Sequence, residues 1–398
     1  MRALLLENVH PDAISVLETA GVRVETVERA YDDQELLAAL DGVQLLGIRS
    51  KTDVPAGVIA AAGDLVAIGA FCIGTNQIDV EAANARGVAV FNAPFSNTRS
   101  VVELAIAEVV ALTRGLTRRN ADMHAGVWDK SAEGAHEIRG RRLGIVGYGN
   151  IGAQLSVLAE ALGMQVLFYD TADKLALGNA RRCESLDELL ENADVVTLHV
   201  DGRATNRDSF GEEQFARMRS GALFLNLSRG FVVDHHALRA HLENGHLAGA
   251  AVDVFPTEPK GRGDEFVSEL RGLPNVILTP HIGGSTEEAQ QDIGRYVAGK
   301  LRDYVVEGST TMSVNLPHLA LPPRPEGHRI AHLHHNVPGV LAAINGTLAE
   351  HKVNIEAQLL GTRGALGYVL TDVAVDYPPA VIDELTAMDE TVRVRLLS

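Results

Sequence analysis

Three side chains in the second half of the chain are of the types that hydride transfer to or from a carbinol carbon requires. Arg229 could hold a substrate carboxylate through two parallel hydrogen bonds, and His281 could give or take the hydroxyl proton. Glu258 could set the protonation state of such a histidine, because a neighbouring carboxylate favours the charged imidazole. Together they would supply a substrate clamp, an acid/base and the group that tunes it.

Each of these groups also has an ordinary structural explanation. A strand-end arginine is usually a solvated member of an ion pair, the Thr-Glu-Pro sequence at 257–259 is usually a turn, and a lone histidine is more often structural than catalytic. All three follow predicted strands, at 222–226, 248–252 and 276–279, and doubly wound sheets bind their ligands at the carboxyl ends of their strands. Their joint placement favours the catalytic interpretation.

A glycine-rich turn at residues 147–152 predicts a dinucleotide site. Its sequence, Gly-Tyr-Gly-Asn-Ile-Gly, matches G-x-G-x-x-G, which is a weak pattern alone in a chain with 38 glycines. A predicted strand at 142–146 leads into the turn and a predicted helix at 150–162 leads out, so phosphates could lie at a helix N-terminus. Asp170, at the end of the next strand, suits a free ribose hydroxyl pair and would repel a 2′-phosphate. The prediction is therefore NAD rather than NADP.

Two α/β series carry these motifs. The first, residues 1–96, alternates short apolar strands with helices, and a long helix is predicted to follow it over 100–122. The second begins at residue 141 and has the doubly wound pattern. The predicted strands are 3–6, 45–48, 65–68 and 88–91 in the first series, and 142–146, 165–169, 195–199, 222–226, 248–252 and 276–279 in the second.

A smaller module is predicted at the carboxyl end. After a helix expected over 285–307, the segment 316–325 contains Pro317, Pro322, Pro323 and Pro325 and is the strongest linker signal in the chain. The remaining residues have the order strand-helix-strand-strand-helix-strand, which indicates a ferredoxin-like fold. Its predicted elements are 328–334, 339–352, 353–360, 367–375, 379–388 and 391–397.

Composition narrows the function. The formal charge of −17 disfavours a nucleic-acid or anionic-membrane partner, since either would be repelled over most of the surface. Only Cys72 and Cys183 are present, so no disulfide framework is expected, and that fits a reducing compartment. The first apolar run is too short for a signal peptide, and no stretch is long enough to span a membrane. A cytoplasmic protein is expected.

With these motifs in place, the chain resembles the D-isomer-specific 2-hydroxyacid dehydrogenases, in the form that carries a C-terminal ACT domain. The matching stretches are 48–52, 92–101, 147–152, 228–230, 257–259 and 279–286. The likeness extends essentially from end to end, and the last stretch is highly specific. The fold expected from the resemblance is α/β, with two doubly wound parallel-sheet domains and a ferredoxin-like βαββαβ ACT domain.

The resemblance implies a role for each site residue. His281 would be the acid/base, Glu258 would hydrogen-bond it and raise its pKa, and Arg229 would clamp the substrate carboxylate and polarise the keto oxygen. The residues implied at the cofactor are Gly147, Gly149, Asn150, Ile151, Gly152, Asp170, Leu227, Ser228, Arg229, Asp253, His281, Ile282, Gly283 and Gly284. Those implied at a phosphorylated substrate are Arg49, Ser50, Lys51, Gly74 and Asn97.

The same resemblance implies a domain plan and an effector. The substrate-binding domain would comprise 1–96 and 285–322, the NAD-binding domain 97–284, and the ACT domain 327–398. In relatives, two ACT domains pair edge to edge and bind L-serine, and the residues in the corresponding positions are His334, Asn336 and Asn354. A role of the module in assembly alone stays open. His332 and His334 could face the same side of a strand as metal ligands do, but without a third ligand no metal is predicted.

The expected activity is NAD-dependent oxidation of D-3-phosphoglycerate to 3-phosphohydroxypyruvate, at the entry to L-serine biosynthesis, in a homo-oligomer for which a tetramer is favoured. One alternative is another D-2-hydroxyacid dehydrogenase, acting on hydroxypyruvate or 2-oxoglutarate. A second is a non-enzymatic NAD(H) sensor. One departure from the family is visible, since Asp201-Gly202-Arg203 stands where relatives usually carry proline. It puts the conformation of the adenine-side loop in doubt.

Overall fold

The structure, a computed structural model, describes residues 1–259, 263–323, 327–374 and 378–397. The chain forms two compact units, one made of residues 1–96 and 290–398 and the other of residues 97–289. Pro325 of the predicted linker lies outside the described residues, as do positions 375 and 398 of the predicted C-terminal module.

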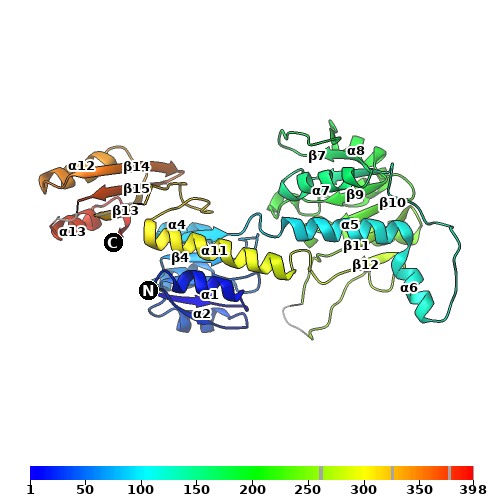
Figure 1. The fold of residues 1–398 in the computed structure, drawn as a ribbon, viewed down its shortest axis with the longest axis horizontal. Coiled ribbons are helices and arrows are strands. Elements are labelled where there is room, and N and C mark those ends of the chain that lie inside the picture. Colours follow the sequence, from blue (N-terminus) through cyan, green and yellow to red (C-terminus); the bar gives the residue numbers. More distant parts are fainter. Residues whose placement is uncertain (260–262, 324–326, 375–377, 398) are drawn as a thin grey trace. The chain divides into compact units, whose positions relative to one another are not determined.

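The amino-terminal part of the first unit, drawn in blue in Figure 1, contains a parallel sheet. The sheet has five strands in the order β2-β1-β3-β4-β5. This is the order of a doubly wound sheet. Its strands are β1 (Arg2–Leu5), β2 (Arg23–Thr26), β3 (Leu45–Ile48), β4 (Ala67–Ala70) and β5 (Ala89–Asn92). Its helices are α1 (Pro11–Glu18), α2 (Asp33–Ala39), α3 (Ala56–Ala61) and α4 (Val80–Arg86). The sequence prediction missed β2 and placed β4 two residues too early.

Both faces of this sheet are buried, because alternate residues of each strand enter different apolar clusters. In β4, Ala67 packs in a cluster with α1 and with α11 (Glu287–Glu307), whereas Ile68 packs in a cluster with α2 and α3. Gly69 permits the close approach of α11, since an added Cβ would lie 2.8 Å from Val297 Cγ1. Burial on both faces explains why these strands read as continuous apolar runs.

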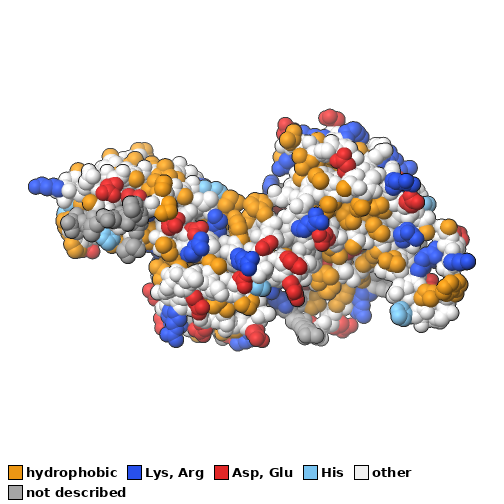
Figure 2. Space-filling view, viewed as in Figure 1, with side chains coloured by type: hydrophobic (Ala, Val, Ile, Leu, Met, Phe, Trp, Pro, Cys, Tyr) orange, Lys and Arg blue, Asp and Glu red, His pale blue; other side chains and the backbone are white. Residues whose placement is uncertain are grey.

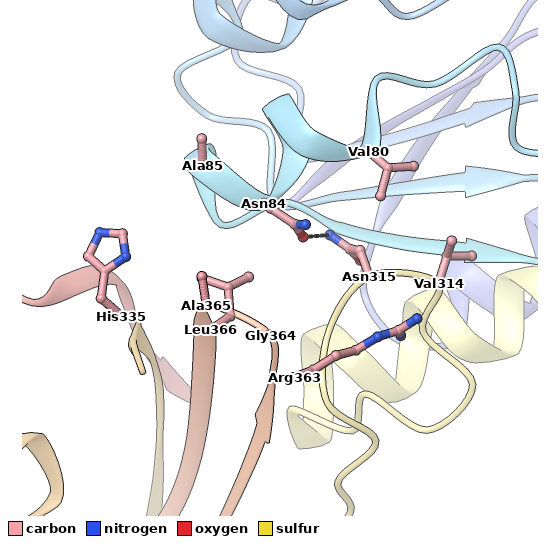
Figure 3. A pocket seen from close by; sticks show the side chains of 10 residues that line it. All are labelled: Val80, Asn84, Ala85, Val314, Asn315, His335, Arg363, Gly364, Ala365 and Leu366. Carbon is pink, nitrogen blue, oxygen red and sulfur yellow. Dashed lines mark hydrogen bonds between the residues drawn. The ribbon is translucent and has the colours of Figure 1, made fainter. Parts of the chain in front are cut away.

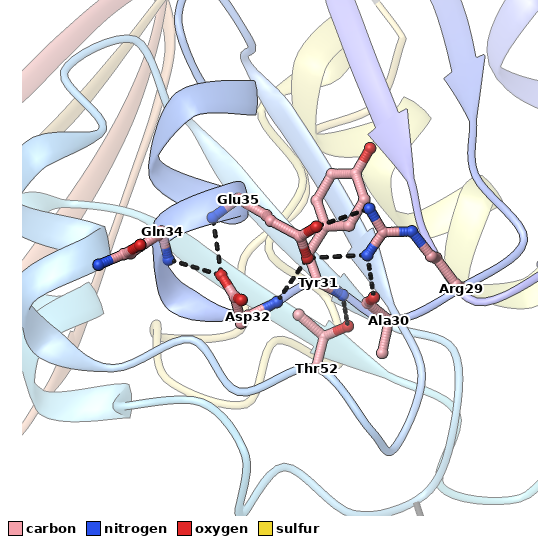
Figure 4. Close-up of polar contacts among 7 residues, drawn as sticks. All are labelled: Arg29, Ala30, Tyr31, Asp32, Gln34, Glu35 and Thr52. Carbon is pink, nitrogen blue, oxygen red and sulfur yellow. Dashed lines mark hydrogen bonds and ion pairs between the residues drawn. The ribbon is translucent and has the colours of Figure 1, made fainter. Parts of the chain in front are cut away.

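Helix α2 begins at a capping box beside the loop that follows β3. Asp32 accepts backbone N–H groups of the first turn, and Glu35 in return accepts the N–H of Asp32 (Figure 4). Glu35 also pairs with Arg29, and these hydrogen bonds lower the pKa of Glu35 to about 2. Thr52 Oγ1 accepts the N–H of Tyr31, which ties the start of α2 to the end of the β3 loop.

The carboxyl-terminal part of the first unit is a four-stranded antiparallel sheet with the order β14-β15-β13-β16. The elements are β13 (His328–His335), α12 (Val340–Glu350), β14 (Ile355–Arg363), β15 (Leu366–Val373), α13 (Ala380–Ala387) and β16 (Thr391–Leu397). One face of the sheet packs on α12 and α13, while the other enters the cluster that contains α11. The predicted βαββαβ order is confirmed.

Buried polar contacts join this C-terminal module to the end of α11. Arg329 forms two hydrogen bonds with Asp372, at 2.6 and 2.8 Å, and its Nη1 donates to the carbonyl of Glu307 at 2.9 Å. The hydroxyl of Tyr368 donates to the carbonyl of Gly308. These donors satisfy carbonyls that a helix C-terminus leaves without intrahelical partners.

The second unit is a seven-stranded parallel sheet with the order β12-β11-β10-β9-β6-β7-β8. This order is that of a Rossmann domain with one further strand. The strands are β6 (Arg142–Val146), β7 (Gln165–Tyr169), β8 (Arg181–Arg182), β9 (Val195–Leu198), β10 (Ala222–Asn226), β11 (Leu247–Val252) and β12 (Val276–Leu278). The helices are α5 (Thr98–Arg114), α6 (Leu116–His124), α7 (Asn150–Ala161), α8 (Leu186–Asn192), α9 (Glu212–Arg217) and α10 (His235–Glu243), with 3-10 turns η1 (Ala204–Asn206) and η2 (Gly230–Val232).

One sequence prediction about this unit was wrong. The single helix expected over 100–122 is two helices, α5 and α6, which meet at Gly115. Gly115 has φ of +57°, a left-handed conformation that ends α5 and that glycine adopts without steric cost.

The described helices include none that is long and apolar enough to cross a membrane. On the face drawn in Figure 2, acidic and basic side chains are interspersed over both units.

Candidate active site

Three neighbouring strand ends of the second unit carry the candidate catalytic groups. Strands β10, β11 and β12 are adjacent and parallel, so their carboxyl ends lie at one edge of the sheet. Arg229 follows β10, Glu258 follows β11 after Asp253, and His281 follows β12. The sheet order therefore gathers residues that are widely separated in the sequence.

Asp253 holds the loop that carries the histidine. Its side chain is almost fully buried, and it accepts the hydroxyl of Thr279 at 2.6 Å and the backbone N–H groups of Ile282 and Gly283 at 2.8 Å. Gly283 lies so close that an added Cβ would be 3.0 Å from the carboxylate. Because these donors occupy both carboxylate oxygens, Asp253 fixes the path of residues 279–283.

His281 and Glu258 form a hydrogen-bonded pair. His281 Nδ1 lies 2.8 Å from Glu258 Oε2, and His281 has φ of +55°, a left-handed backbone conformation that is uncommon outside glycine. The hydrogen bond to Glu258 raises the pKa of His281 above its ordinary value, although burial acts against it. Burial acts to raise the pKa of Glu258, but the hydrogen bond and charge of His281 outweigh it, so the net shift is downward.

Arg229 stands at the start of the turn after β10. Asn226, buried at the end of the strand, accepts the N–H and the hydroxyl of Ser228 and donates to the carbonyl of Arg229 at 3.1 Å. Gly230 then passes so close to Phe255 that no larger residue would fit without movement. The charge of Arg229 acts on both members of the His281–Glu258 pair, favouring the ionised carboxylate and opposing the charged imidazole.

The glycine turn joins β6 to α7. Gly147 has φ of +93°, and a Cβ there would lie 2.6 Å from the carbonyl oxygen of His199, so the turn requires glycine. A Cβ on Gly152 would collide with the carbonyl oxygen of Gly147. The helix can therefore approach the strand this closely only because residue 152 is glycine. At Gly149 nothing lies within 4 Å of that position, which leaves the backbone open at the N-terminus of α7. Asn150 and Ile151 form the first turn of that helix.

In the first unit, Glu7 organises the loop after β3. Its buried carboxylate accepts the backbone N–H groups of Arg49, Lys51 and Thr52 at 2.9 to 3.1 Å. The side chains of Ser50 and Lys51 are exposed, and that of Arg49 is half-buried. Glu7 was not predicted as a site residue. The available signal was its position two residues after the end of β1, the neighbour of β3 in the sheet.

Gln77, also not predicted, brings Arg49 and Gly74 together. Its Nε2 donates to the carbonyl of Arg49 at 2.6 Å and lies 3.4 Å from that of Gly74. Asn97, the remaining residue predicted at the substrate, belongs to the second unit and begins α5. Its Oδ1 is buried and makes no hydrogen bond among the described residues.

Comparison with known proteins identifies the family of this chain. Residues 106–283 match the NAD-binding domain of the D-isomer specific 2-hydroxyacid dehydrogenases. Over its full length the chain is 48% identical to the D-3-phosphoglycerate dehydrogenase of Haemophilus influenzae and 50% identical to that of Escherichia coli K12, covering 97% of each. The chain belongs to the D-isomer specific 2-hydroxyacid dehydrogenase family. It is an NAD-dependent oxidoreductase.

Two further similarities complete the comparison. The solved structure of D-2-hydroxyisocaproate dehydrogenase matches this chain with a TM-score of 0.70 and 26% identity, over 79% of this chain and all of the other. Residues 330–393 match the AHAS small subunit-like ACT domain, so the C-terminal module is an ACT domain. The predicted fold class is thereby confirmed.

The residues around the glycine turn fit NAD. The open backbone at Gly149 and the free N–H groups of the first turn of α7 suit a pyrophosphate. Asp170 is half-buried at the end of β7 and accepts the N–H groups of Tyr148 and Ala172 at 2.8 Å, which fixes the orientation of its carboxylate. In the unusual segment at 201–203, Arg203 pairs with Asp201 at 2.7 Å.

The three predicted effector residues lie in the ACT domain of this dehydrogenase but differ in environment. His334 is buried, packs on Gly367, and its Nδ1 contacts the carbonyl of His335 at 2.8 Å. Asn336 is exposed and donates to the carbonyl of Gly364, while Asn354 is exposed just before β14. His332 contacts Thr391 through Nε2, and burial lowers its pKa to about 4.

Proposed function

We propose that this dehydrogenase oxidises D-3-phosphoglycerate to 3-phosphohydroxypyruvate with NAD, the first step of L-serine biosynthesis. The observation that carries the proposal is full-length similarity to the D-3-phosphoglycerate dehydrogenases, at up to 50% identity, together with the His281–Glu258 pair that the reaction needs.

The proposed reaction assigns each side chain one task. Because Nδ1 of His281 is held by Glu258, Nε2 is the nitrogen left to take the substrate hydroxyl proton. Glu258 stabilises the imidazolium that results, and Arg229 holds the substrate carboxylate in its planar fork. NAD held at the glycine turn would supply the acceptor for the hydride that leaves the carbinol carbon. In the reverse direction His281 returns the proton to the keto oxygen.

We propose that the loop after β3 binds the phosphoryl end of the substrate. Arg49 and Lys51 supply positive charge in a chain of formal charge −17, and Ser50, Gly74 and Asn97 would add hydrogen bonds. On this proposal, residues 1–96 and 285–322 form the substrate-binding domain, 97–284 the NAD-binding domain and 327–398 the ACT domain.

A panel of 2-hydroxy and 2-oxo acids tests the substrate. A preference in kcat/KM for 3-phosphoglycerate over unphosphorylated acids is expected, and Arg49→Ala should remove most of that preference. Arg23→Ala, an exposed arginine on the edge strand β2, is the matched control and should keep it. Equal turnover of hydroxypyruvate or 2-oxoglutarate would identify another dehydrogenase of the family, and no NADH formation with any acid would favour the sensor.

We also propose feedback by L-serine at the ACT domain, through His334, Asn336 and Asn354. The two asparagines are exposed, and their amides suit an amino acid that presents an ammonium and a carboxylate at once. Millimolar L-serine should inhibit the enzyme, and Asn336→Ala should relieve the inhibition while Lys352→Gln, an exposed change in the same domain, should not. If millimolar L-serine leaves the activity unchanged, the feedback proposal is excluded and the catalytic proposal stands.

We propose a homotetramer because one unit exposes a group of apolar side chains and the other exposes edge strands. In the second unit, Leu116, Met123, Val127 and Trp128 are exposed apolar side chains on and after α6, and Trp128 is 76% exposed. In the ACT domain, β14 and β16 are edge strands of the described sheet. Light scattering should give a mass of four chains, and Trp128→Ala should lower it. A monomeric parent protein would contradict the proposal.

A further inference from the structure

A cavity with both polar and apolar lining lies within the first unit, and none of the proposed catalytic groups lines it. It has a volume of about 390 Å³ and is bounded by α4, by the loop before the ACT domain, and by the turn between β14 and β15 (Figure 3). Asn84 comes from α4, Asn315 from the loop, His335 from the end of β13, and Arg363 from the hairpin. The dehydrogenase reaction proposed above uses none of these residues.

The cavity lacks negative charge. All ten residues that line it lie within the described part of the chain, and not one carries a carboxylate, although the chain has 52 Asp and Glu residues and a formal charge of −17. Its only groups able to carry charge are Arg363 and His335, and both would be positive. Although the protein as a whole is strongly acidic, the lining of this hollow makes it a local position where an anion is favoured.

The polar groups of the cavity have hydrogen-bonding capacity to spare. Arg363 Nη1 makes two long contacts, with the carbonyls of Ser313 at 3.3 Å and Leu316 at 3.4 Å, and no carboxylate of the described residues lies within ion-pair distance of Arg363. Asn84 uses its Oδ1 to accept from Asn315, so its amide N–H groups remain for a ligand. A guanidinium with unused donors on a fixed fork matches a carboxylate or a phosphate.

The wall formed by the loop is held rigidly. Asn315 Oδ1 accepts the N–H of Val90 at 2.8 Å and the hydroxyl of Ser313 at 3.0 Å. Its Nδ2 donates to the carbonyl of Val88 and to Asn84, each at 2.9 Å. Asn315 is thus fully engaged and fixes Asn84 in place, so a ligand would meet a donor that is already oriented. Such preorganisation lowers the entropic cost of binding.

The β14–β15 hairpin, which forms another wall, is held by hydrogen bonds from Asn336. The backbone N–H of Asn336 donates to the carbonyl of Ala365 at 2.8 Å, and its Nδ2 donates to the carbonyl of Gly364 at 3.1 Å. Gly364 has φ of +58°, which glycine adopts readily. Arg363 therefore lies next to a turn whose conformation is fixed by hydrogen bonds from Asn336 to two of its carbonyl groups.

We propose that this cavity binds a small anion, a carboxylate or a phosphate group, with Arg363 as its charged anchor and with Asn84 and His335 as further donors. The residues that line the cavity are none of those proposed for catalysis or for serine binding. A ligand bound in this cavity would contact both the β14–β15 hairpin and α4.

Calorimetry on the full-length protein tests the proposal without turnover. Arg49→Gln and Arg229→Gln are combined to weaken anion binding at the active site, and inorganic phosphate and malonate are titrated separately into this protein. One saturable site per chain is expected for at least one of them, and the tighter of the two identifies the ligand group. Adding Arg363→Gln should weaken that binding about 10- to 100-fold, the equivalent of a hydrogen bond to a charged group.

Two further variants control for folding. Lys352→Gln removes a positive charge from an exposed position in the same domain and should leave binding unchanged. Asn84→Ala keeps the charge of Arg363 and the hydrogen bond of Asn315 to Val88, and should weaken binding by a smaller factor. Failure of both anions to bind the double variant, or equal binding after Arg363→Gln, would overturn the proposal. Neither result would affect the proposed dehydrogenase activity.

Discussion

The imidazole of His281 and the carboxylate of Glu258 lie 2.8 Å apart, between Nδ1 and Oε2, although 23 positions separate them in the chain. The hydrogen bond occupies Nδ1, so the proposed reaction would use Nε2, and it stabilises the imidazolium. The left-handed backbone at His281, with φ of +55°, is maintained by a loop whose N–H groups are bound by Asp253. Orientation and protonation of His281, the proposed acid/base, are thus controlled by two different carboxylates.

Glu258→Gln should narrow the pH range over which the enzyme reduces a keto acid. The hydrogen bond to Glu258 raises the pKa of His281, so the protonated acid persists to higher pH than for an ordinary histidine. With glutamine, the decline of kcat/KM for keto-acid reduction on the alkaline side should move to lower pH. The measurement is a pH profile of NADH-dependent reduction.

The matched control for this variant is Glu265→Gln, which neutralises a largely exposed carboxylate in the same unit that makes only a 3.7 Å contact with Arg271. Its profile should coincide with that of the parent enzyme. An unchanged alkaline limb in Glu258→Gln would show that Glu258 does not set the pKa of His281.

Arg229→Lys should reduce kcat/KM by about 10- to 100-fold, because an ammonium cannot reproduce the two parallel hydrogen bonds of a guanidinium to a carboxylate. NAD affinity, measured by fluorescence titration, should change little. Arg239→Lys conserves charge in the same way at a surface ion pair with Glu243 and should cost almost no activity. Comparable activity in Arg229→Lys and the parent would exclude the proposed clamp.

Much of the fold could be predicted because buried parallel strands read as apolar runs. Strands β3, β6, β7, β10 and β16 begin and end where the sequence predicts. Strand β2 was missed since it lies at the sheet edge with mostly exposed residues, Arg-Val-Glu-Thr, and has no apolar signal. The break at Gly115 was missed because the same sequence, Leu-Thr-Arg, stands on both sides of the glycine, and a left-handed turn is a matter of backbone conformation.

The candidate site could be predicted only where function requires a recognisable residue type at a strand end. Arg229, Glu258 and His281 met that condition. Glu7, Gln77 and the pairing of Asn226 with Ser228 did not, because their partners are backbone groups or side chains that only the folded sheet brings near. A sequence shows which groups could react, whereas the groups that hold them depend on tertiary contacts.

Glu7→Gln should loosen the loop proposed to bind phosphate. The carboxylate receives three backbone N–H groups, and an amide can supply only one accepting oxygen, so at least one buried N–H would lose its partner. An increase in KM for 3-phosphoglycerate of about 5- to 20-fold is expected, with stability lowered by about 1 to 3 kcal/mol. Steady-state kinetics and denaturant unfolding measure the two effects.

Glu25→Gln, at an exposed position on β2 with a 3.6 Å contact to Arg2, provides the comparison for Glu7. It should leave both KM and stability close to those of the parent. If Glu7→Gln raises no KM while destabilising the protein, Glu7 supports the fold and the loop after β3 does not bind substrate.

Glu108 should make the stability of the enzyme depend on pH. It is 3% exposed on α5, and neither carboxylate oxygen has a hydrogen-bond partner among the described residues. Burial, with a smaller contribution from the charge of Asp253, raises the pKa of Glu108 to about 8. Between the unfolded pKa of about 4.3 and the folded value, the native state holds a proton that the unfolded state has lost, so stability falls as pH rises.

Glu108→Gln removes this titration and keeps the shape of the side chain. The variant does not lose this stability, so the difference in free energy of unfolding between variant and parent should grow by about 3 kcal/mol from pH 5 to pH 8. Denaturant titration at several pH values measures the difference. Glu103→Gln, on the same helix but exposed and paired with Arg99, should show the pH dependence of the parent. Parallel curves for the parent and Glu108→Gln would mean that Glu108 titrates normally. The carboxylate would then need a partner, such as bound water, that stabilises its charge inside the unit.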